Sequence, residues 1–344
     1  MKTIYSEAHR LHDGQAELID GKLLPCFETA QRAEMVISRV REVRLGEVLP
    51  PQDFGRKTLE RVHRASFLDF LENAWAAWSE LGRNCDALPV IWPARTLRND
   101  REPETIDGKL GYFALDAGTP ITAGTWQAAK AAANVALTGQ KLLASGARAA
   151  FSLCRPPGHH AGADTYGGYC FLNNAAIAAQ ASRNDGAEKV ALLDIDYHHG
   201  NGTQTIFYDR ADVLVCSLHG HPVQEYPYFL GYDDETGSAR GEGYNRNYPL
   251  RWGTGWARWS EALDDACKHI AAFGAEVLIV SLGVDTFKDD PISEFKLDSD
   301  NYLDIGRRIA ALGKPTLFVM EGGYALESIG LNTVNVLSGF ENAA

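Results

Sequence analysis

Ionisable and glycine-rich segments follow five short apolar runs of this sequence. The segments are Arg155 to His160, Asp194 to Gly202, Ser217 to His221, Gly283 to Asp285 and Glu321 to Tyr324. In an open α/β sheet, ligands bind outside the carboxyl ends of the strands. If the apolar runs are parallel strands, all these segments meet at one edge of the sheet. We therefore predict a functional site at that edge.

Two candidate metal ligands, Asp196 and His198, stand two residues apart directly after one apolar run. In an extended backbone, residues i and i+2 point the same way, so the carboxylate and the imidazole converge. Asp285, at another strand end, is the natural third ligand. One His and two Asp with an open position are typical of a catalytic divalent ion, with zinc the first choice and iron(II) or manganese behind it. The alternative, an ion pair within the loop, fits the other segments less well.

The adjacent histidines His159 and His160 follow a rigid Pro-Pro-Gly sequence. Adjacent imidazoles beside a metal site suit proton transfer to and from water. Each imidazole needs a partner for its other nitrogen, and Asp194 and Asn201 are the candidates. A carboxylate partner raises the pKa of a histidine, whereas a neutral Asn leaves its histidine easier to deprotonate.

Two aromatic features stand near the same predicted edge. Tyr324 follows Gly322-Gly323, which leaves the chain free to place a phenol where it donates to a developing oxyanion. The alternative is an aromatic ring packed after a turn. The run Tyr226 to Phe229 either lines a channel or packs against the core.

The apolar runs alternate with helical patterns from about residue 148 onward. The predicted strands are residues 149–153, 190–194, 213–217, 277–281 and 316–320, and the predicted helices are 173–183, 256–273 and 301–312. Strands that are apolar throughout are covered on both faces. The alternation therefore predicts an α/β fold with three α-β-α layers around a mainly parallel sheet.

The chain is interpreted as one domain, residues 1–344, with an insertion at about residues 80–120. Residues 95–120 carry charges, Gly and Pro with no sustained period, so we expect an irregular segment there. Such long irregular segments are usually functional or mobile, which predicts a lid, a rim or a subunit contact.

The composition excludes several classes of protein. The formal net charge is -12, which makes non-specific binding to nucleic-acid phosphates unfavourable and suits a cationic ligand, although acidity often serves only solubility. The longest apolar stretch is far shorter than the roughly 20 residues that a membrane span needs. Six cysteines are scattered without a C-x-x-C pair, which argues against a zinc ribbon and a disulfide scaffold. We therefore expect a cytoplasmic protein with no nucleic-acid or membrane partner.

Taken together, these motifs resemble the histone deacetylase superfamily of zinc amidohydrolases, and within it the bacterial acetylpolyamine amidohydrolases. The resemblance covers nearly the whole chain and includes Phe27 to Glu34, the insertion around residues 85–120 and Gly167 to Asn174. It implies the arginase/deacetylase-like form of the α/β fold.

The resemblance also assigns roles to the residues of the predicted site. It implies one catalytic zinc ion per subunit, held by Asp196, His198 and Asp285. His159 is then a mainly electrostatic partner and His160 the general base and acid. Tyr324 polarises the amide carbonyl.

Further implied features concern ions, substrate and assembly. A structural potassium ion is implied near Asp194, Asp196, His198, Ser217 and Leu218, and a second one near backbone oxygens of Phe207, Arg210 and Val213. Tyr169, Tyr226 and Ile292 would line a narrow substrate channel. The insertion would form a homodimer contact that narrows the entrance to this channel.

The sequence departs from the family pattern at two positions. Gly118 stands where some members have a Glu late in the insertion; Asp116 is nearby, and Asp107 matches an acidic position of the same loop. These two Asp residues are the candidates for contacting the distal ammonium of a substrate. Asn201 stands where some branches have Asp, which bears on the basicity of His160.

The function expected from the resemblance is deacetylation of a small cationic acetylated amine, such as acetylputrescine or acetylcadaverine. A protein acetyl-lysine deacetylase on the same scaffold is the nearest alternative, but the long insertion disfavours an open rim. A dinuclear manganese ureohydrolase would need a carboxylate two residues after Asp285, where Phe287 stands. A non-catalytic module that binds acetylated amines is the third alternative.

Overall fold

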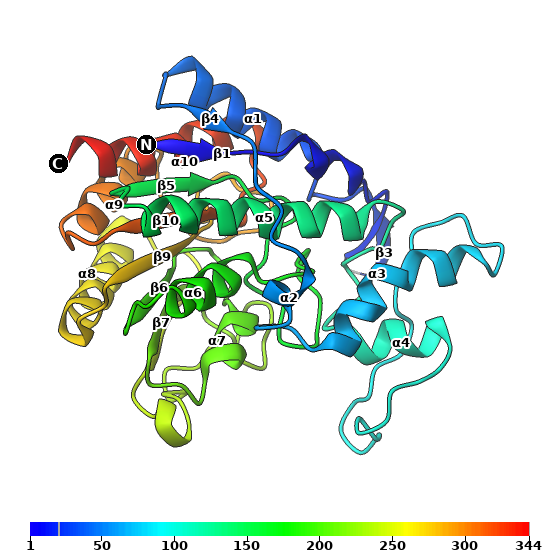
Figure 1. The fold of residues 1–344 in the computed structure, drawn as a ribbon. Helices are drawn as coiled ribbons and strands as arrows, with labels where there is room; N and C mark the ends of the chain where they lie inside the picture. Colours follow the sequence, from blue (N-terminus) through cyan, green and yellow to red (C-terminus); the bar gives the residue numbers. More distant parts are fainter. Residues whose placement is uncertain (20, 344) are drawn as a thin grey trace.

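An eight-stranded sheet forms the centre of the computed structural model, which describes residues 1–19 and 21–343 (Figure 1). Its strand order is β4-β1-β5-β10-β9-β6-β7-β8, and every neighbouring pair is parallel. The strands are β1 (Lys2–Ile4), β4 (Val48–Leu49), β5 (Ala149–Ser152), β6 (Val190–Asp194), β7 (Val213–Gly220), β8 (Asn245–Leu250), β9 (Val277–Leu282) and β10 (Thr316–Met320). The predicted mainly parallel sheet is confirmed.

Helices cover both faces of this sheet, and α3 and α4 lie apart from it (Figure 1). The helices are α1 (Ala30–Glu42), α2 (Arg56–Leu59), α3 (Ala65–Ser79), α4 (Ile106–Phe113), α5 (Thr125–Ala144), α6 (Asn174–Asn184), α7 (Asn201–Phe207), α8 (Trp256–Phe273), α9 (Asn301–Ala310) and α10 (Leu326–Asn342). Short 3₁₀ turns, η1 (Glu7–Leu11) and η2 (Ala239–Gly241), complete the set.

Two hydrophobic clusters hold the three layers together. Leu193 and Val280 point from the sheet into the cluster that contains α1, α8, α9 and α10. Their neighbours Leu192 and Ile279 point into the other cluster, which contains α5 and α6. Successive strand residues point to opposite faces, so a strand that is apolar throughout contributes to both layers. This explains why the central strands show no polar alternation.

The predicted elements agree closely with the observed ones. Strands 190–194 and 316–320 and helix 256–273 have the predicted bounds. β5 ends one residue before the predicted end, β9 extends one residue further and β7 three residues further. α6 is shifted by one residue, and α9 ends two residues before the predicted end.

The insertion contains a helix where the sequence predicts an irregular segment. Ile106, Leu110 and Phe113 lie on one face of α4, and the ring centroid of Phe113 lies 4.8 Å from that of Phe70 in α3. Gly111 weakens the helical signal of this segment, because glycine disfavours helices. The structure requires glycine there, since a Cβ would lie within 2 Å of the Ile91 carbonyl oxygen. The prediction is therefore wrong for residues 106–113, because close backbone packing required a residue that disfavours helices. In Figure 1, α3 and α4 project away from the sheet.

A small antiparallel hairpin, β2 (Glu17–Ile19) and β3 (Lys22–Leu24), lies outside the main sheet. It comes between β1 and α1 in sequence. The hairpin has no counterpart among the predicted elements, yet it contributes side chains to the cavity described below.

Candidate active site

The loops that follow β5, β6, β9 and β10 bring the predicted site residues to one edge of the sheet. β6 and β9 are paired with Asp194 opposite Ser281, so both strands end at the same level. Asp196 and His198 follow β6, and Asp285 follows β9. All of these polar residues are buried.

The structure brings Asp196, His198 and Asp285 together. One potential ligand atom from each lies within 4.8 Å of the others. Nδ1 of His198 lies 3.2 Å from Oδ2 of Asp285 and 3.5 Å from Oδ1 of Asp196. The predicted convergence of these three side chains is confirmed.

Backbone groups hold the two carboxylates in place. Asp196 accepts from the N–H of His198 at 2.9 Å and from that of Gly322 at 2.7 Å, and Asp285 accepts from the N–H of Tyr197 at 2.9 Å. Gly322 is required here, because its Cβ would lie 2.5 Å from Asp285 and 2.6 Å from Asp196 oxygens.

The charges of this set fit a divalent cation. Burial and the neighbouring Asp196 charge raise the pKa of Asp285. Burial opposes a charge on His198, but the two carboxylates raise its pKa well above the usual value. Two buried carboxylates beside an imidazole are therefore stable only with a positive charge among them. One nitrogen and two carboxylate donors suit Zn²⁺, which requires the imidazole to be neutral.

The adjacent histidines have chemically different partners. Nδ1 of His159 lies 2.9 Å from Oδ2 of Asp194, and Nδ1 of His160 lies 2.7 Å from Oδ1 of Asn201. Burial opposes a charge on His159, but Asp196 and Asp194 raise its pKa to about 10. Burial, followed by the charges of His159 and His198, lowers the pKa of His160 well below its usual value. The predicted pairing of each histidine is present.

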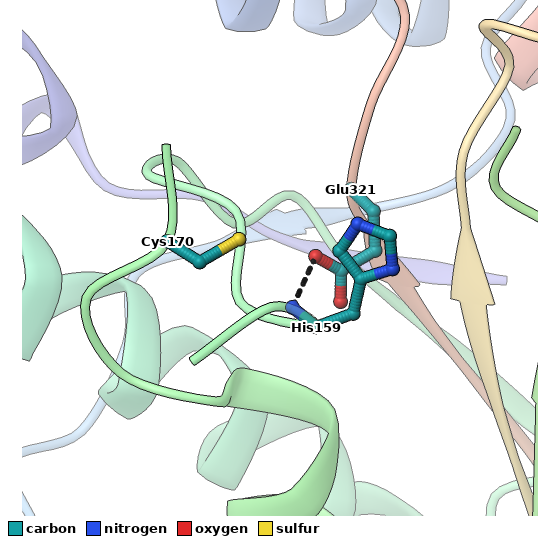
Figure 2. Close-up of side chains that lie close together, drawn as sticks. All are labelled: His159, Cys170 and Glu321. Carbon is teal, nitrogen blue, oxygen red and sulfur yellow. Dashed lines mark hydrogen bonds between the residues drawn. The ribbon is translucent and has the colours of Figure 1, made fainter. Parts of the chain in front are cut away.

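A second buried group fixes the backbone of the histidine pair (Figure 2). Oε2 of Glu321 accepts from the N–H groups of Gly158 at 2.6 Å and His159 at 3.1 Å. Cys170 lies beside them, and its thiol donates to the carbonyl of Gly168 at 3.3 Å. Glu321 was not among the predicted site residues, although its position directly after β10 was a signal.

Tyr324 lies after β10 and is 7% exposed. The guanidinium of Arg32, in α1, lies 4.6 Å from the centroid of its ring. Arg32 also donates to the carbonyl oxygens of Gly323 and Glu321 on the same loop. Arg32 was not among the predicted site residues, because its distance in sequence from Tyr324 gives no local signal.

A cavity of about 420 Å³ leads to these groups. His160, His198 and Tyr324 line it, together with the predicted channel residues Tyr169, Tyr226 and Ile292. The ring centroid of Tyr226 lies 5.1 Å from that of His160, and the centroid of Tyr169 lies 5.6 Å from that of Tyr324. The cavity is therefore a narrow space between aromatic rings that ends at the buried polar set.

Comparison of the sequence with known protein families identifies the family of this chain. Residues 26–340 match the family described as the histone deacetylase domain. The chain belongs to the histone deacetylase family.

The chain is similar to several known proteins over nearly its full length. It is 63% identical over 341 residues to acetylpolyamine amidohydrolase 2 of Pseudomonas aeruginosa, with 99% of each chain covered. It is 51% identical over 339 residues to acetylpolyamine amidohydrolase of Mycoplana ramosa, with 98% of this chain and 99% of that one covered. A crystal structure of acetylpolyamine aminohydrolase from Burkholderia pseudomallei matches with a TM-score of 0.93 at 37% identity, covering 100% of this chain and 99% of that chain.

Membership of the histone deacetylase family supports a hydrolase that acts on amides. No helix within residues 1–19 and 21–343 is long and apolar enough to cross a membrane.

One predicted channel residue, Asp107, lies outside the cavity. Asp107 does not line the cavity, because Arg83 binds its carboxylate with two hydrogen bonds, at 2.6 and 3.1 Å. Asp116 does line the cavity, as does Gly118. Both oxygens of Asp116 are already used, by Gly118, Thr119, Gly168 and Tyr226.

Two cavity carboxylates, Glu17 and Glu225, were not among the predicted site residues. Glu17 is 1% exposed; it accepts from the N–H of Phe27 at 2.8 Å and from the Tyr169 hydroxyl. Glu225 accepts from Tyr197, Tyr226 and Trp252. No local sequence pattern distinguishes either residue from an ordinary surface Glu.

The residues implied for the first potassium ion lie beside the site, whereas Val213, implied for the second, lies at the opposite end of the strands, where it pairs with Val190. Asp194 pairs with Ser217 across β6 and β7, next to Leu218. Phe207 ends α7, its carbonyl accepts from the N–H of Arg210 at 3.0 Å, and Val213 begins β7. Both potassium sites stay predictions.

Proposed function

We propose that this chain is a zinc-dependent deacetylase that hydrolyses N-acetylated diamines or polyamines, such as acetylputrescine and acetylcadaverine, to acetate and the free amine. The observation that carries the proposal is a cavity lined by His160, His198 and Tyr324, in which His198 belongs to the buried set that it forms with Asp196 and Asp285. The full-length similarity to chains named acetylpolyamine amidohydrolase supports the substrate class.

Asp196, His198 and Asp285 would hold the zinc ion. When bound, such an ion polarises a carbonyl and lowers the pKa of water toward about 7. The chain's contribution is to fix the two carboxylate donors by the backbone hydrogen bonds described above and to keep all three donors buried.

His160 is the proposed general base and acid. Its Nδ1 is paired with the neutral Asn201, so its other nitrogen is free to take a proton from the attacking water and to deliver it to the leaving amine. His159, paired with Asp194, acts through its charge. A positively charged neighbour favours the anionic character that develops at the reacting carbonyl.

Tyr324 is the proposed donor to that developing oxyanion. Its hydroxyl belongs to a buried side chain that lines the end of the cavity. Removing one such donor from an enzyme costs about 100- to 1000-fold in rate.

Glu17 is the proposed partner of the distal ammonium of the substrate. Asp116 already accepts four hydrogen bonds, and Glu225 accepts three from neighbouring groups. Among the described residues, Glu17 accepts from two groups, Phe27 and Tyr169, and burial raises the pKa of its carboxyl. An ammonium beside this buried carboxylate would offset the cost of its charge.

The structural potassium ions and the homodimer stay predictions from the family resemblance, and the cytoplasmic location stays a prediction from the composition.

One experiment tests the proposed function. Purified protein is given acetylputrescine, acetylcadaverine, longer acetylated polyamines and an acetyl-lysine peptide, and its zinc content is measured on the same sample. Rapid release of acetate from the free amines with about one zinc per chain is expected. Preference for the peptide would favour a protein deacetylase, and two manganese ions per chain would favour a ureohydrolase.

A further inference from the structure

The segment that carries Tyr324 is held by side chains from distant parts of the chain. The N–H of Gly322 donates to Asp196, and the carbonyls of Gly323 and Glu321 accept from Arg32. These contacts precede Tyr324 along the chain. The backbone amide of Tyr324 itself is bound by another residue.

That residue is Asp290, in the loop after β9. Its Oδ2 accepts from the N–H of Tyr324 at 2.7 Å and from the N–H of Ala325 at 3.2 Å. Its Oδ1 accepts from the N–H of Ile292, a cavity residue, at 3.2 Å. Asp290 is 6% exposed, and it belongs neither to the metal-binding set nor to the cavity lining.

We propose that Asp290 is a positioning residue that fixes the Tyr324 hydroxyl relative to the metal-binding residues. The inference rests on the proposed function, because it assigns Tyr324 the role of oxyanion donor. One carboxylate joins the backbone of Tyr324 to the loop after β9, which contains the proposed ligand Asp285 and the cavity residue Ile292.

The physical basis is the direction of the Tyr324 side chain. The backbone dihedral angles of a residue determine where its Cβ points, and two N–H bonds to one carboxylate oxygen restrict those angles for Tyr324. Hydrogen bonds to an ionised acceptor are about twice as strong as neutral ones. A displacement of about 1 Å at a catalytic group costs on the order of 100-fold in rate. Loss of Asp290 should therefore reduce the contribution of Tyr324.

A double-mutant cycle separates positioning from general stabilisation. Asp290→Asn is made in the wild-type enzyme and in Tyr324→Phe, and kcat and KM are measured on an acetylated diamine. We expect Asp290→Asn alone to lower kcat about 10- to 100-fold, with KM changed less than about 3-fold. In the Tyr324→Phe background, the same change should lower kcat less than about 3-fold, because the hydroxyl is already absent.

A second readout is independent of activity. Amide hydrogen exchange of Tyr324, Ala325 and Ile292 is followed by NMR in the zinc-loaded and the metal-free protein. In Asp290→Asn these three amides should exchange at least about 10-fold faster than in the wild type, while amides of β6 are unchanged. Asp53→Asn is the control, because Asp53 also accepts a backbone N–H, from Gly55, but is exposed and remote from the cavity.

Two results would overturn the proposal: an equal loss of kcat in both backgrounds, or wild-type kcat and exchange rates in Asp290→Asn. If Asp290→Asn does not fold, the same cycle is run with Asp290→Glu, which keeps the charge. A wild-type enzyme that hydrolyses no acetylated amine would refute the proposed function instead, and the exchange rates would still show whether Asp290 fixes this segment.

Discussion

Nδ1 of His160 lies 2.7 Å from Oδ1 of Asn201, so the proposed base is oriented by a neutral amide. His159, the next residue back, is oriented by the carboxylate of Asp194. The two histidines are therefore held by similar geometry but in opposite electrostatic environments. This difference supports the proposed roles, with proton transfer at His160 and a fixed charge at His159.

The first prediction concerns Asn201→Asp. A carboxylate at this position should raise the pKa of His160, which burial now lowers. Because His160 must be neutral to accept a proton, the acidic limb of the pH profile of kcat/KM should move to higher pH, by about 1–2 units. Asn184→Asp adds the same charge at the exposed end of α6 and is the control. An unchanged acidic limb in Asn201→Asp would argue against His160 as the base.

The second prediction concerns the proposed metal ligands. Asp285→Ala should abolish hydrolysis and zinc retention, since it removes one of three donors. Chelation of the wild type should also lower its melting temperature, and added zinc should restore it, because a ligand bound only by the folded state stabilises that state. Asp289→Ala, an exposed residue of the same loop, should keep both zinc and activity. Metal analysis and thermal unfolding measure these effects, and a zinc-loaded, active Asp285→Ala enzyme would contradict the ligand assignment.

The third prediction concerns the distal charge of the substrate. Glu17→Gln should raise KM for acetylputrescine about 10-fold, since hydrogen bonds to charged groups contribute about 1.5–3 kcal/mol. The KM for N-butylacetamide, which has no ammonium, should change little. Glu80→Gln, at the exposed end of α3, is the control. An equal rise for both substrates would show that Glu17 shapes the cavity without binding the ammonium.

The sequence was most informative where two functional residues are close together in sequence and directly follow a strand. Asp196 and His198 are placed by their spacing of two and by the strand at 190–194, so their convergence could be predicted. The apolar central strands were recognisable because both of their faces are covered. At the edge of the sheet, β8 contains Pro249 and two Asn residues, so local propensity gave no signal for a strand.

Residues placed by long-range contacts could not be predicted. Glu17 reaches the cavity from a hairpin far from the other site residues in sequence, and Arg32 and Asp290 act on a loop that follows a different strand. Asp107 was assigned to the channel by its position in the insertion, but its ion pair with Arg83 holds it elsewhere. Such partners depend on the tertiary fold, which no local pattern encodes.

The last prediction concerns stability at acidic pH. Nδ1 of His63 lies 2.8 Å from the carbonyl of Gly162, and Nε2 accepts from the N–H of Asn173 at 3.0 Å, so the folded state requires a neutral imidazole. Burial lowers the pKa of His63 from 6.5 to about 4. Between these values the unfolded chain binds a proton that the folded chain does not, so the free energy of unfolding falls as pH falls from 6.5 to 4.

The size of this effect follows from the pKa difference. One pKa unit corresponds to about 1.4 kcal/mol, so His63 should account for about 3 kcal/mol of the lost stability. His63→Gln should be less stable than the wild type at neutral pH but should lose about 3 kcal/mol less on acidification, as measured by urea unfolding of metal-free protein. Phe67→Leu, which alters the ring packed against His63, removes no titratable group and should keep the wild-type pH dependence. If His63→Gln also keeps that dependence, the protonation of His63 does not limit the acid stability of this fold.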